Sequence, residues 1–538
     1  MPHPCISLRS SIAIIGFGLA SLAGAQQLDA AFGTGGFVPY GGAQSNGELN
    51  KGIGNNMAVQ PDGKLVVCMD KSNPNGTDLF LYTYRYLPDG SPDPDFGING
   101  VSKLFVGDQC KAYDLQLEPD GRITIIGESE YCVNGICGAP QFIMLRLLPN
   151  GDLDASFGVN GHITTTEVFG ALGTFAIPYR VRRLANGKYF IGGRGINGKP
   201  FVARLLATGF PDPTFAVNGV YSDATQYGYF ADLGVDANGA CFALFRVYNY
   251  QGGNPVEANL SDLYVRKFTS SGALDATFGN AGVFLGDFVN ADIPTSITFT
   301  PSNDLLITGQ DYIAFVNASG TLSSSVPNGF RTIAIPSAGT VFLNKLVVVG
   351  AGRYLLCGKV HQEVGGNFQE KALVAQVDAS GQFIPAFNGT GYLLLDHGSV
   401  GATGWNGKLC RLHDLDIASN GVVFGSGYRN PIAGNTLRAL YLIKLIDVPM
   451  QGSGVGVLEH EAVDVLAFPN PTDGAVQINI AVSAHYTVSS ADGRIVAQGR
   501  WAPGVRTLDL SPWPVGIYTV QLQTPEGEAL GVSRVSRQ

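Results

Sequence analysis

The chain has 538 residues, of which only 14% are charged and 72 are glycine. This composition lacks the Lys, Glu and Arg that long solvated helices need, whereas 45% hydrophobic residues suffice for a large core and exclude a wholly disordered chain. With 34 basic and 43 acidic residues the formal charge is −9, which argues against nucleic acid as a partner.

Residues 1–25 have the pattern of a secretory signal peptide. Arg9 precedes a short apolar run that ends at Ala25 in an A-x-A cleavage signal, so cleavage is expected between Ala25 and Gln26. The run is shorter than the ~20 apolar residues that a transmembrane helix needs, and no later run qualifies. The sequence therefore predicts an exported protein without a transmembrane segment. An N-terminal membrane anchor is the alternative.

One motif recurs about every sixty residues along most of the chain. Its first copy reads LDAAFGTGG and its third reads LDASFGVNG, and the last two copies are degenerate. The apolar residue at the centre of each copy is expected to anchor a core. In chain order these central residues are Phe32, Phe96, Phe157, Phe215, Phe278, Val326 and Phe387.

Each repeat also contains an alternating run that enters a Gly turn and an apolar run that ends in a second one. The first is a hairpin signal, and the whole repeat accounts for about four strands. The hairpin turns lie at Gly63, Gly121, Gly187, Gly239, Asn303-Asp304, Gly352 and Gly421. The sequence therefore predicts an all-β fold, a seven-bladed β-propeller of four-stranded repeats over residues 26–448. Another closed or stacked β-repeat is the alternative.

These motifs resemble the delta-60 repeat family, whose repeat reads L-D-x-x-F-G-x-x-G followed by a P-D-G-K-type hairpin. The resemblance covers roughly residues 26–447 and is strongest in the first five copies. It implies a β-propeller in an exported bacterial protein. No chemistry is transferred by it from residue to residue.

The repeat pattern stops before the C-terminus. Residues 449–463 are Gly-rich and unpatterned, which is typical of a linker. Residues 464–538 have their own rhythm of short strands and turns, which predicts a small β-sandwich.

This tail resembles the C-terminal sorting domain of type IX secretion substrates. The motifs that carry the resemblance are FPNP at 468–471 with Gly474, DGR at 492–494, and LDL at 508–510 leading to GIY at 516–518. The resemblance implies a partnership with the type IX secretion machinery and export across the outer membrane of a Bacteroidota-type bacterium. It also implies that the tail is removed, near 449–463, and that the mature protein is released or attached to the cell surface. An ordinary terminal β-domain is the alternative.

No standard catalytic, phosphate-binding or metal-binding signature occurs, so no catalytic, cofactor-binding or metal-ligating residue is assigned. His413 adjoins Asp414, but consecutive strand residues point to opposite faces, which makes the pair a poor catalytic dyad. The Asp-rich turn with Asp89, Asp93 and Asp95 offers oxygens to Ca²⁺. Because such turns recur in every good repeat without extra carboxylates, we expect Asp to accept backbone N–H groups instead, and no cofactor.

Two classes of function remain open at this point. The first is a binding module, expected to be monomeric, that recognises an extracellular polymer, glycan or protein through its loops or central channel. The second is a secreted hydrolase or lyase with residues from several blades at the channel mouth. Carboxylates or histidines clustered at one mouth favour the enzyme, and an exposed aromatic patch favours binding. Trp405 is the only tryptophan of the repeat region, which weakens a sugar-stacking site without excluding one built on Tyr.

Cysteine positions suggest disulfides, which persist in the oxidising compartments that an exported protein enters. Cys68 and Cys357 lie five residues after their hairpin glycines, and Cys110 and Cys410 lie eleven before theirs. This duplication predicts the bridges Cys68–Cys110 and Cys357–Cys410. Buried cysteines that pack as small hydrophobic residues are the alternative. A third bridge is predicted between Cys132 and Cys137, which flank a predicted turn. Cys241 then has no predicted disulfide partner.

A basic residue precedes the motif Asp by eight positions in several repeats, and both are lost together elsewhere. This joint loss predicts an ion pair in each repeat, at Arg85–Asp93, Arg146–Asp154, Arg204–Asp212 and Lys267–Asp275. Asp29 has no upstream base and Lys444 has no downstream acid. We expect these two to meet, with the strand after Gly36 joining the sheet of Lys444, which closes the ring. An open array with decayed ends is the alternative.

Overall fold

The protein is described by a computed structural model, in which most of the chain between Gln27 and Arg537 is placed. The described residues are 27–38, 56–72, 79–130, 132–133, 136–169, 176–195, 199–222, 228–248, 250–251, 254–255, 261–288, 292–336, 338–350, 352–364, 367–397, 409–418, 421–429, 439–446, 467–468, 474–480, 483–490, 495–523 and 529–537. The predicted signal peptide and its cleavage site between Ala25 and Gln26 lie outside them, as do Trp405 and the predicted linker.

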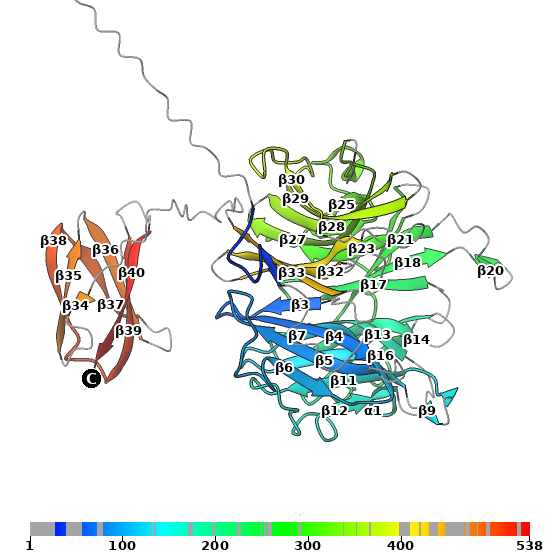
Figure 1. Cartoon of the computed structure of the whole chain (residues 1–538), viewed down its shortest axis with the longest axis horizontal. Coiled ribbons are helices and arrows are strands. Elements are labelled where there is room, and N and C mark those ends of the chain that lie inside the picture. The colour runs from blue at the N-terminus through cyan, green and yellow to red at the C-terminus, as the bar shows by residue number, and fades with distance from the viewer. Residues whose placement is uncertain are drawn as a thin grey trace, which may run out of the picture. The chain divides into compact units, whose positions relative to one another are not determined.

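Consecutive antiparallel sheets make up the repeat region, and each is built from strands that follow one another in the chain (Figure 1). The first three sheets contain β3 (Asn56–Val59), β4 (Leu65–Ser72), β5 (Leu79–Tyr86) and β6 (Val101–Leu104); β7 (Gln109–Leu117), β8 (Ile123–Glu130), β11 (Gln141–Leu147) and β12 (His162–Thr164); and β13 (Ala176–Arg183), β14 (Tyr189–Gly195), β15 (Pro200–Leu205) and β16 (Val220–Ser222). A short helix, α1 (Thr165–Phe169), follows the second of these sheets.

The next three sheets repeat the same order of strands. They contain β17 (Gly228–Val235), β18 (Cys241–Tyr248), β21 (Ser261–Phe268) and β22 (Val283–Gly286); β23 (Pro294–Phe299), β24 (Leu305–Gly309), β25 (Tyr312–Val316) and β26 (Phe330–Thr332); and β27 (Thr340–Gly350), β28 (Arg353–Val364), β29 (Asn367–Asp378) and β30 (Tyr392–Leu395). A single 3-10 turn, η3 (Pro327–Gly329), precedes β26, and two small hairpins project from the sheets: β9 (Cys132–Val133) with β10 (Ile136–Cys137), and β19 (Tyr250–Gln251) with β20 (Asn254–Pro255).

The last sheet combines the two ends of the repeat region. Its strands are β31 (Cys410–Ile417), β32 (Val423–Arg429) and β33 (Ala439–Ile446), joined by β1 (Gln27–Leu28) and β2 (Phe37–Val38). Both N-terminal strands pair antiparallel with β33, β1 through Leu28 opposite Leu445 and β2 through Phe37 opposite Ile443. Among the described residues of the repeat region this gives seven sheets of four or five strands, the arrangement of a β-propeller.

The repeated motif forms a tight turn after the third strand of each sheet. In the second copy the Asp93 N–H donates to the Arg85 carbonyl (2.9 Å), and the Gly100 N–H donates to the Phe96 carbonyl (2.9 Å). Gly97 has a φ of +53°, and a Cβ there would lie 2.1 Å from the Val101 carbonyl oxygen. A side chain at Gly97 would clash with that carbonyl, which explains why the motif favours Gly directly after Phe, although the fourth copy has Ala216 there at a φ of +45°.

The same turn joins neighbouring sheets in five of the repeats. The residue after the central Phe donates its N–H to a carbonyl in the following repeat, in the pairs Gly33–Asp89 (2.8 Å), Gly97–Asn150 (2.7 Å), Gly158–Thr208 (3.0 Å), Ala216–Ser271 (2.7 Å) and Gly279–Ser319 (2.8 Å). The first of these links the sheet that contains both ends of the repeat region to the β3–β6 sheet. The hydrogen bonds between sheets therefore include the junction between the last sheet and the first.

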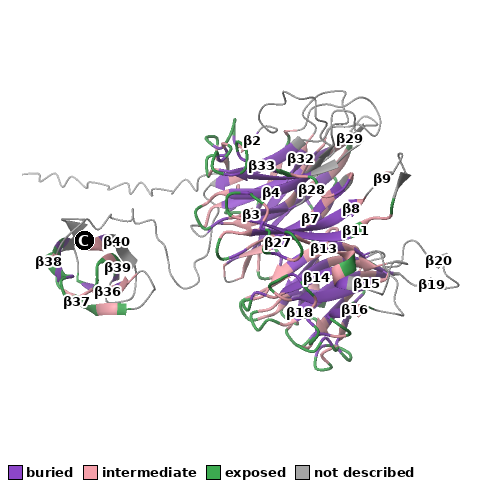
Figure 2. Cartoon of the chain, turned by 90° about the horizontal axis from the view of Figure 1, so that it is seen from below, coloured by how far each residue is buried: buried purple, intermediate pink, exposed green. Residues whose placement is uncertain are grey.

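The hydrophobic core lies between neighbouring sheets. Phe96 is fully buried and packs with residues of the β3–β6 and β7–β12 sheets, and Phe32 packs in the same way between the last sheet and the first. All seven central residues of the motif are at most 2% exposed, so they are core anchors as predicted. Buried residues follow the strands, whereas exposed residues gather in the connections (Figure 2).

The predicted bridges Cys68–Cys110 and Cys357–Cys410 are wrong, because all four residues are buried thiols. Cys68 and Cys110 belong to one apolar cluster between two sheets, so the duplicated spacing reflects a repeated packing position that a small hydrophobic side chain fills. Burial raises the pKa of Cys357 and Cys410. Cys132 lies opposite Cys137 in the β9–β10 hairpin, but the Cys137 side chain is outside the described part, so that bridge stays a prediction.

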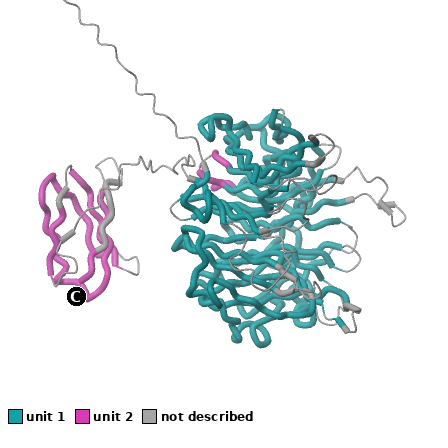
Figure 3. The backbone as a smooth tube through the Cα atoms, in the orientation of Figure 1, with its two compact units in different colours: residues 1–299, 303–347, 355–449 teal, residues 300–302, 348–354, 450–538 magenta. Residues whose placement is uncertain are grey.

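The chain divides into two compact units, shown in Figure 3. The first comprises residues 1–299, 303–347 and 355–449, and the second comprises 300–302, 348–354 and 450–538. The C-terminal part has a three-stranded and a four-stranded sheet, formed by β34 (Ala467–Phe468), β35 (Ala475–Ile480) and β38 (Gly504–Asp509), and by β37 (Ile495–Trp501), β36 (Ala484–Ser490), β39 (Gly516–Gln523) and β40 (Ala529–Arg537).

One core joins the two C-terminal sheets. Ile478 of β35 and Leu508 of β38 pack with Val488 of β36 and Val520 of β39. The tail is therefore a small β-sandwich, as its turn rhythm predicts. No helix in the described part of the chain combines the length and the apolar character that crossing a membrane requires.

Candidate functional site

The first strand of each sheet lies at the centre of the propeller. These strands are β3, β7, β13, β17, β23, β27 and β31. In five of them the pairing with the second strand shifts register at one residue, a β-bulge. A bulge lets two consecutive side chains point to the same side of a strand, here toward the channel.

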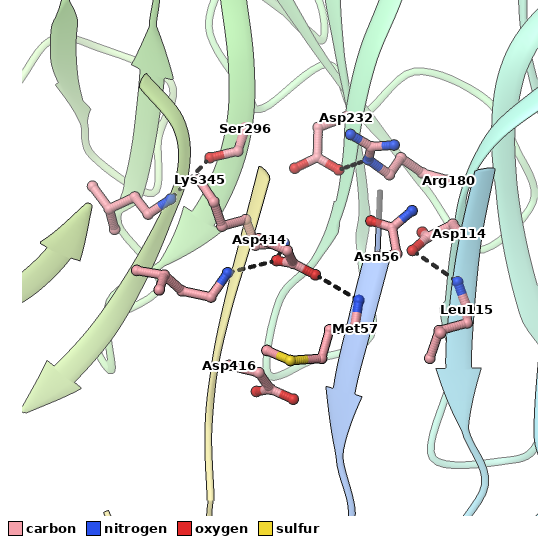
Figure 4. Close-up of polar contacts among 12 residues, drawn as sticks. Asn56, Met57, Asp114, Leu115, Arg180, Asp232, Ser296, Lys345, Asp414 and Asp416 are labelled. Carbon is pink, nitrogen blue, oxygen red and sulfur yellow. Dashed lines mark hydrogen bonds and ion pairs between the residues drawn. The ribbon is translucent and has the colours of Figure 1, made fainter. Parts of the chain in front are cut away.

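The residue after each bulge lies seven positions before the hairpin turn of its repeat. The equivalent positions of the seven first strands form what we call the polar ring, consisting of Asn56, Asp114, Arg180, Asp232, Ser296, Lys345 and Asp414. Figure 4 shows these side chains converging from neighbouring strands. None of the seven is an aliphatic residue, so the ring offers hydrogen-bonding and charged groups to the channel.

Ring side chains join each first strand to the next one. Asp114 Oδ2 accepts the Val181 N–H of β13 (2.9 Å), and Asp232 Oδ2 accepts the Ile297 N–H of β23 (3.0 Å). Ser296 Oγ accepts the Leu346 N–H of β27 (3.3 Å). In each case the donor lies one residue after the ring position of the following strand, so the link is the same in each of these repeats.

The same link closes the circle between the last strand and the first. Asp414 Oδ2 of β31 accepts the Met57 N–H of β3 (3.2 Å), and Asp416 Oδ2 accepts the Val59 N–H (2.8 Å) (Figure 4). The remaining junctions use amide side chains. Asn56 Nδ2 donates to the Tyr113 carbonyl, and Asn344 Nδ2 donates to the Leu412 carbonyl (2.6 Å). Together with the ion pairs between β13 and β17, these bonds connect all seven first strands.

Basic side chains compensate the carboxylates of the ring. Arg182 lies between two of them, with Nη1 2.8 Å from Asp114 Oδ2 and Nη2 2.8 Å from Asp232 Oδ1. Arg180 Nε lies 3.2 Å from Asp232 Oδ1, and Lys345 Nζ lies 3.7 Å from Asp414 Oδ1. Each acid of the ring therefore has a cation within ion-pair distance.

The carboxylates differ in their tendency to ionise. Burial favours the neutral form of Asp232, but the charges of Arg182 and Arg180 outweigh it and lower the pKa of this carboxyl. Burial raises the pKa of Asp414, which has only the more distant Lys345 beside it. The pKa values of Asp232 and Asp414 are thus shifted in opposite directions.

A cavity of about 300 Å³ opens over the ring. Its described lining consists entirely of polar or ionisable residues, namely Asn56, Tyr113, Asp114, Arg180, Arg182, Asp232, Thr295, Ser296, Asn344, Lys345, His413 and Asp414. All seven ring residues are among them, and the bulges supply Tyr113, Thr295 and His413. The cavity is thus built by residues from all seven first strands.

The bulge in β31 corrects the expectation for His413 and Asp414. Regular alternation would place them on opposite faces, yet both line the cavity, because the register shifts between Leu412 and Asp414. His413 nevertheless stacks on Tyr428, with ring centroids 5.4 Å apart, and Asp414 accepts backbone N–H groups.

The predicted repeat ion pairs lie on the outer part of the sheets, away from the cavity lining. The structure places the charged atoms of the four internal pairs within contact distance: Arg85–Asp93 (2.6 Å), Arg146–Asp154 (2.7 Å), Arg204–Asp212 (2.7 Å) and Lys267–Asp275 (3.0 Å). The Arg146 guanidinium also lies 4.5 Å from the centre of the Phe157 ring, and Nη1 donates to the Ala207 carbonyl of the next repeat (3.2 Å). This arginine thus connects the motif Asp, the motif Phe and the following sheet.

The two unmatched charges of the sequence also lie together. Lys444 Nζ is 2.7 Å from Asp29 Oδ2, and the Asp29 N–H donates to the Lys444 carbonyl (2.9 Å). The hydrogen bond from Lys444 lowers the pKa of Asp29 against the opposing effect of burial. This contact is part of the sheet in which β1 and β2 pair with β33.

The Asp-rich turn uses its carboxylates within the turn. Asp89 Oδ1 accepts the N–H of Ser91 (2.8 Å), and Asp93 Oδ1 accepts the N–H of Asp95 (3.0 Å). Asp93 Oδ2 faces Arg85 and Lys64. The described residues contain no group of three or more His, Cys, Asp or Glu arranged to hold a metal ion.

Sequence reasoning missed the polar ring, although a signal for it exists. Asp-Leu occurs seven residues before a hairpin glycine in three repeats, as Asp114-Leu115, Asp232-Leu233 and Asp414-Leu415. Each Asp Oδ1 accepts the N–H of that Leu, at 2.8 to 3.0 Å, which explains the dipeptide. When the repeats are aligned on their hairpin glycines, these Asp-Leu dipeptides fall at the same position.

Family comparisons agree with this architecture. Residues 60–96, 118–157 and 184–215 match the model described as "Domain of unknown function (DUF5122) beta-propeller", and residues 466–530 match the "Secretion system C-terminal sorting domain". The chain carries DUF5122 β-propeller repeats and a type IX sorting domain. The sorting domain indicates export to the cell surface or secretion, and an interaction of this protein with the secretion machinery.

Solved structures similar to this chain include a secretion component and two enzymes. They include PorZ of Porphyromonas gingivalis, a surface component of its type IX secretion system (13% identity, 94% of this chain and 75% of that chain, TM-score 0.29). Others are the polysaccharide lyase Uly1 (12%, 73% and 89%, 0.43) and an α-L-arabinofuranosidase of Fusarium graminearum (11%, 62% and 95%, 0.38). With TM-scores below 0.5, these similarities do not indicate an activity for this chain. No curated protein matches the sequence.

The acids that join the last strand to the first predict a pH-dependent stability. Burial raises the pKa of Asp416 to about 6, and the charge of Asp414 acts in the same direction. Because this pKa lies above that of the unfolded chain, the stabilisation is present in acid and is lost as the pH rises through about 6. We expect Asp416→Asn to raise the free energy of unfolding at pH 8, by at most about 3 kcal/mol.

Denaturant titrations at pH 5 and pH 8 measure the free energy of unfolding. The increase caused by Asp416→Asn should be smaller at pH 5 than at pH 8. The amide is compatible with the site, since Gln116 occupies the same position of β7 and its Oε1 accepts the Arg183 N–H (3.4 Å). Asp62→Asn, at an exposed turn, serves as the control and should leave the pH dependence of the free energy of unfolding unchanged. An equal effect of Asp416→Asn at both pH values would contradict the prediction.

Proposed function

We propose that the protein is an exported β-propeller that acts as a binding module, and that it takes a polar extracellular ligand, such as a glycan, another polymer or a protein segment, into the cavity over the polar ring. The observation that carries this proposal is the lining of the cavity, in which every described residue bears a polar or ionisable group. Binding sites use such convergent polar groups to orient a ligand.

The state of the ring carboxylates favours binding over catalysis. Asp114, Asp232 and Asp414 each accept backbone N–H groups from two strands and face a cation. A carboxylate held by these bonds stabilises the fold, and moving it to reach a substrate would cost the links between sheets. Such groups are better placed to form a fixed surface than to exchange protons.

The test is a screen of the secreted protein against polysaccharides and ester substrates, in which both retention and turnover are measured. Lys345→Ala changes the lining without removing a backbone link, and we expect it to weaken retention of the ligand found. Lys103→Ala, on the exposed outer strand β6, is the control and should retain it. Equal retention by the wild type and both variants would place the ligand elsewhere and overturn the proposal.

A second candidate is a hydrolase or lyase with its site in the same cavity. The observation that favours it is the opposite displacement of the pKa values of Asp232 and Asp414, because acid and base roles need such a difference. In this case the screen would show turnover, and Asp414→Asn would abolish turnover while leaving retention. Retention without turnover favours the binding module.

A further inference from the structure

The bulged strands present two kinds of side chain to the cavity. Ring residues are tied to the next strand. In three of the bulged strands the residue one position earlier is half-buried and lines the cavity without supplying a side-chain carboxylate or permanent cation, as does the equivalent residue of β27. We call these four residues the bulge layer, which consists of Tyr113, Thr295, His413 and, on β27, Asn344. Asn344 also donates to the Leu412 carbonyl, so its amide has both a structural and a surface role.

We infer that the bulge layer determines ligand specificity and that the ligand is a neutral saccharide, an inference that rests on the proposed function of the cavity. Hydroxyl and amide groups both donate and accept hydrogen bonds, which suits the hydroxyl groups of a sugar. Thr295 and Asn344 supply these groups, and Tyr113 and His413 supply aromatic rings for the apolar face of a sugar.

Charge balance supports a neutral ligand. The lining contains three acids, Asp114, Asp232 and Asp414, and three permanent bases, Arg180, Arg182 and Lys345. Because the six formal charges cancel and the acids lie within ion-pair distance of the bases, an anionic or cationic sugar gains little net attraction. Such a sugar would also have to displace an existing ion pair.

The aromatic rings of this layer are held in place by other side chains. Tyr113 contacts Tyr179 edge to face, with ring centroids 5.4 Å apart and an interplanar angle of 82°, and His413 stacks on Tyr428. The hydroxyl of Thr295 lies 2.9 Å from Thr308 Oγ1. These contacts restrict the side chains before a ligand arrives, which lowers the entropy cost of binding.

Calorimetric titration of the full secreted protein tests the inference. The probes are neutral xylo-, manno- and gluco-oligosaccharides, with oligogalacturonate as the acidic probe and chitosan oligomers as the cationic one. We expect binding of a neutral probe, and binding about tenfold weaker after Tyr113→Ala, the loss expected for one aromatic contact. Tyr113→Phe keeps the ring and should retain most of the affinity, and Asn344→Ala should also weaken binding.

Tyr229→Ala is the matched control, because Tyr229 is half-exposed on β17 and does not line the cavity. Neutral binding that is unchanged by Tyr113→Ala and Asn344→Ala overturns the inference. Preferential binding of the acidic or cationic probe also overturns it, as does failure of every neutral probe to bind at millimolar concentration. If a non-saccharide ligand binds and Lys345→Ala weakens it, the proposed function stands and only the saccharide inference fails.

Discussion

Deletion of residues 26–38 from the mature protein is expected to destabilise the propeller by more than the loss of any single core side chain. The deletion removes β1 and β2 from the last sheet and takes out Phe32, which is fully buried between that sheet and the first. Loss of a buried Phe alone costs about 3–5 kcal/mol. The deletion also exposes the edge of β33 and leaves Lys444 without Asp29, so we expect aggregation at high protein concentration.

Denaturant unfolding, followed by tryptophan and tyrosine fluorescence, measures this effect. Because the shortened protein is prone to aggregate, Phe32→Ala provides a second measurement in an otherwise complete chain. Phe387→Ala is its matched control, since Phe387 is the equivalent anchor within the continuous chain and is equally buried. We expect similar losses from the two substitutions. An unchanged midpoint for the deletion would show that the N-terminal strands do not contribute to closure of the ring.

Arg146→Met is expected to cost up to about 3–5 kcal/mol, because it removes the closer of the two guanidinium groups that contact the buried Asp154 and leaves Arg122 Nη1, at 3.3 Å, beside it. The side chains of Arg146 and Asp154 are at most 7% exposed, and their Nε and Oδ2 atoms are 2.7 Å apart. At the equivalent position of a later repeat, Lys267 and Asp275 are 19% and 21% exposed. Lys267→Met therefore serves as a matched control, with an expected cost of about 1 kcal/mol or less.

The same pair predicts how stability responds to acid. Burial opposes ionisation of Asp154, but the Ser156 hydroxyl and the Arg146 guanidinium outweigh it and lower the pKa to about 2. Its contribution is thus present above the unfolded pKa near 3.8 and is lost as the pH falls toward about 2. Arg146→Met should show a smaller change over this range than the wild type. Substitution of both partners, as Arg146→Met with Asp154→Leu, should recover part of the stability at neutral pH. A cost equal to that of Arg146→Met alone would show that the Asp154 charge, left with the more distant Arg122 as its guanidinium partner, is not the cause of the loss.

The repeat sequence predicted the sheets well because each repeat restates its local signals. The motif glycine after Phe96, the hairpin glycine at Gly121 and the alternating strand between them all have local physical causes. Closure of the ring was also predictable, since Asp29 and Lys444 are each missing a partner in the sequence. This prediction depends on the constant spacing of eight residues between the basic residue and the motif Asp, which several repeats show.

The cavity was harder to predict because it depends on bulges. Period-two alternation placed His413 and Asp414 on opposite faces, and a one-residue shift in β31 brings both to the cavity. The two predicted disulfide bridges between repeats were wrong for a different reason. Cys68 and Cys110 do occupy repeated positions, but spacing cannot distinguish two thiols packed in one apolar cluster from a covalent bridge.

The last sheet combines strands from both ends of the repeat region, which affects the order in which the propeller can fold after synthesis. Gln27 pairs with Ile446, so the closing pair joins residues 446 − 27 = 419 positions apart. Contacts of such long range are slow to form, whereas the hairpins within each repeat are local. The first-made strands, β1 and β2, therefore stay without their partner β33 until nearly the whole propeller has been made. Since β1 begins one residue after the predicted cleavage site, a signal peptide or affinity tag left at that end would extend directly from a strand of the closing sheet. For this protein, the timing of N-terminal processing and the completion of the ring are expected to be kinetically linked.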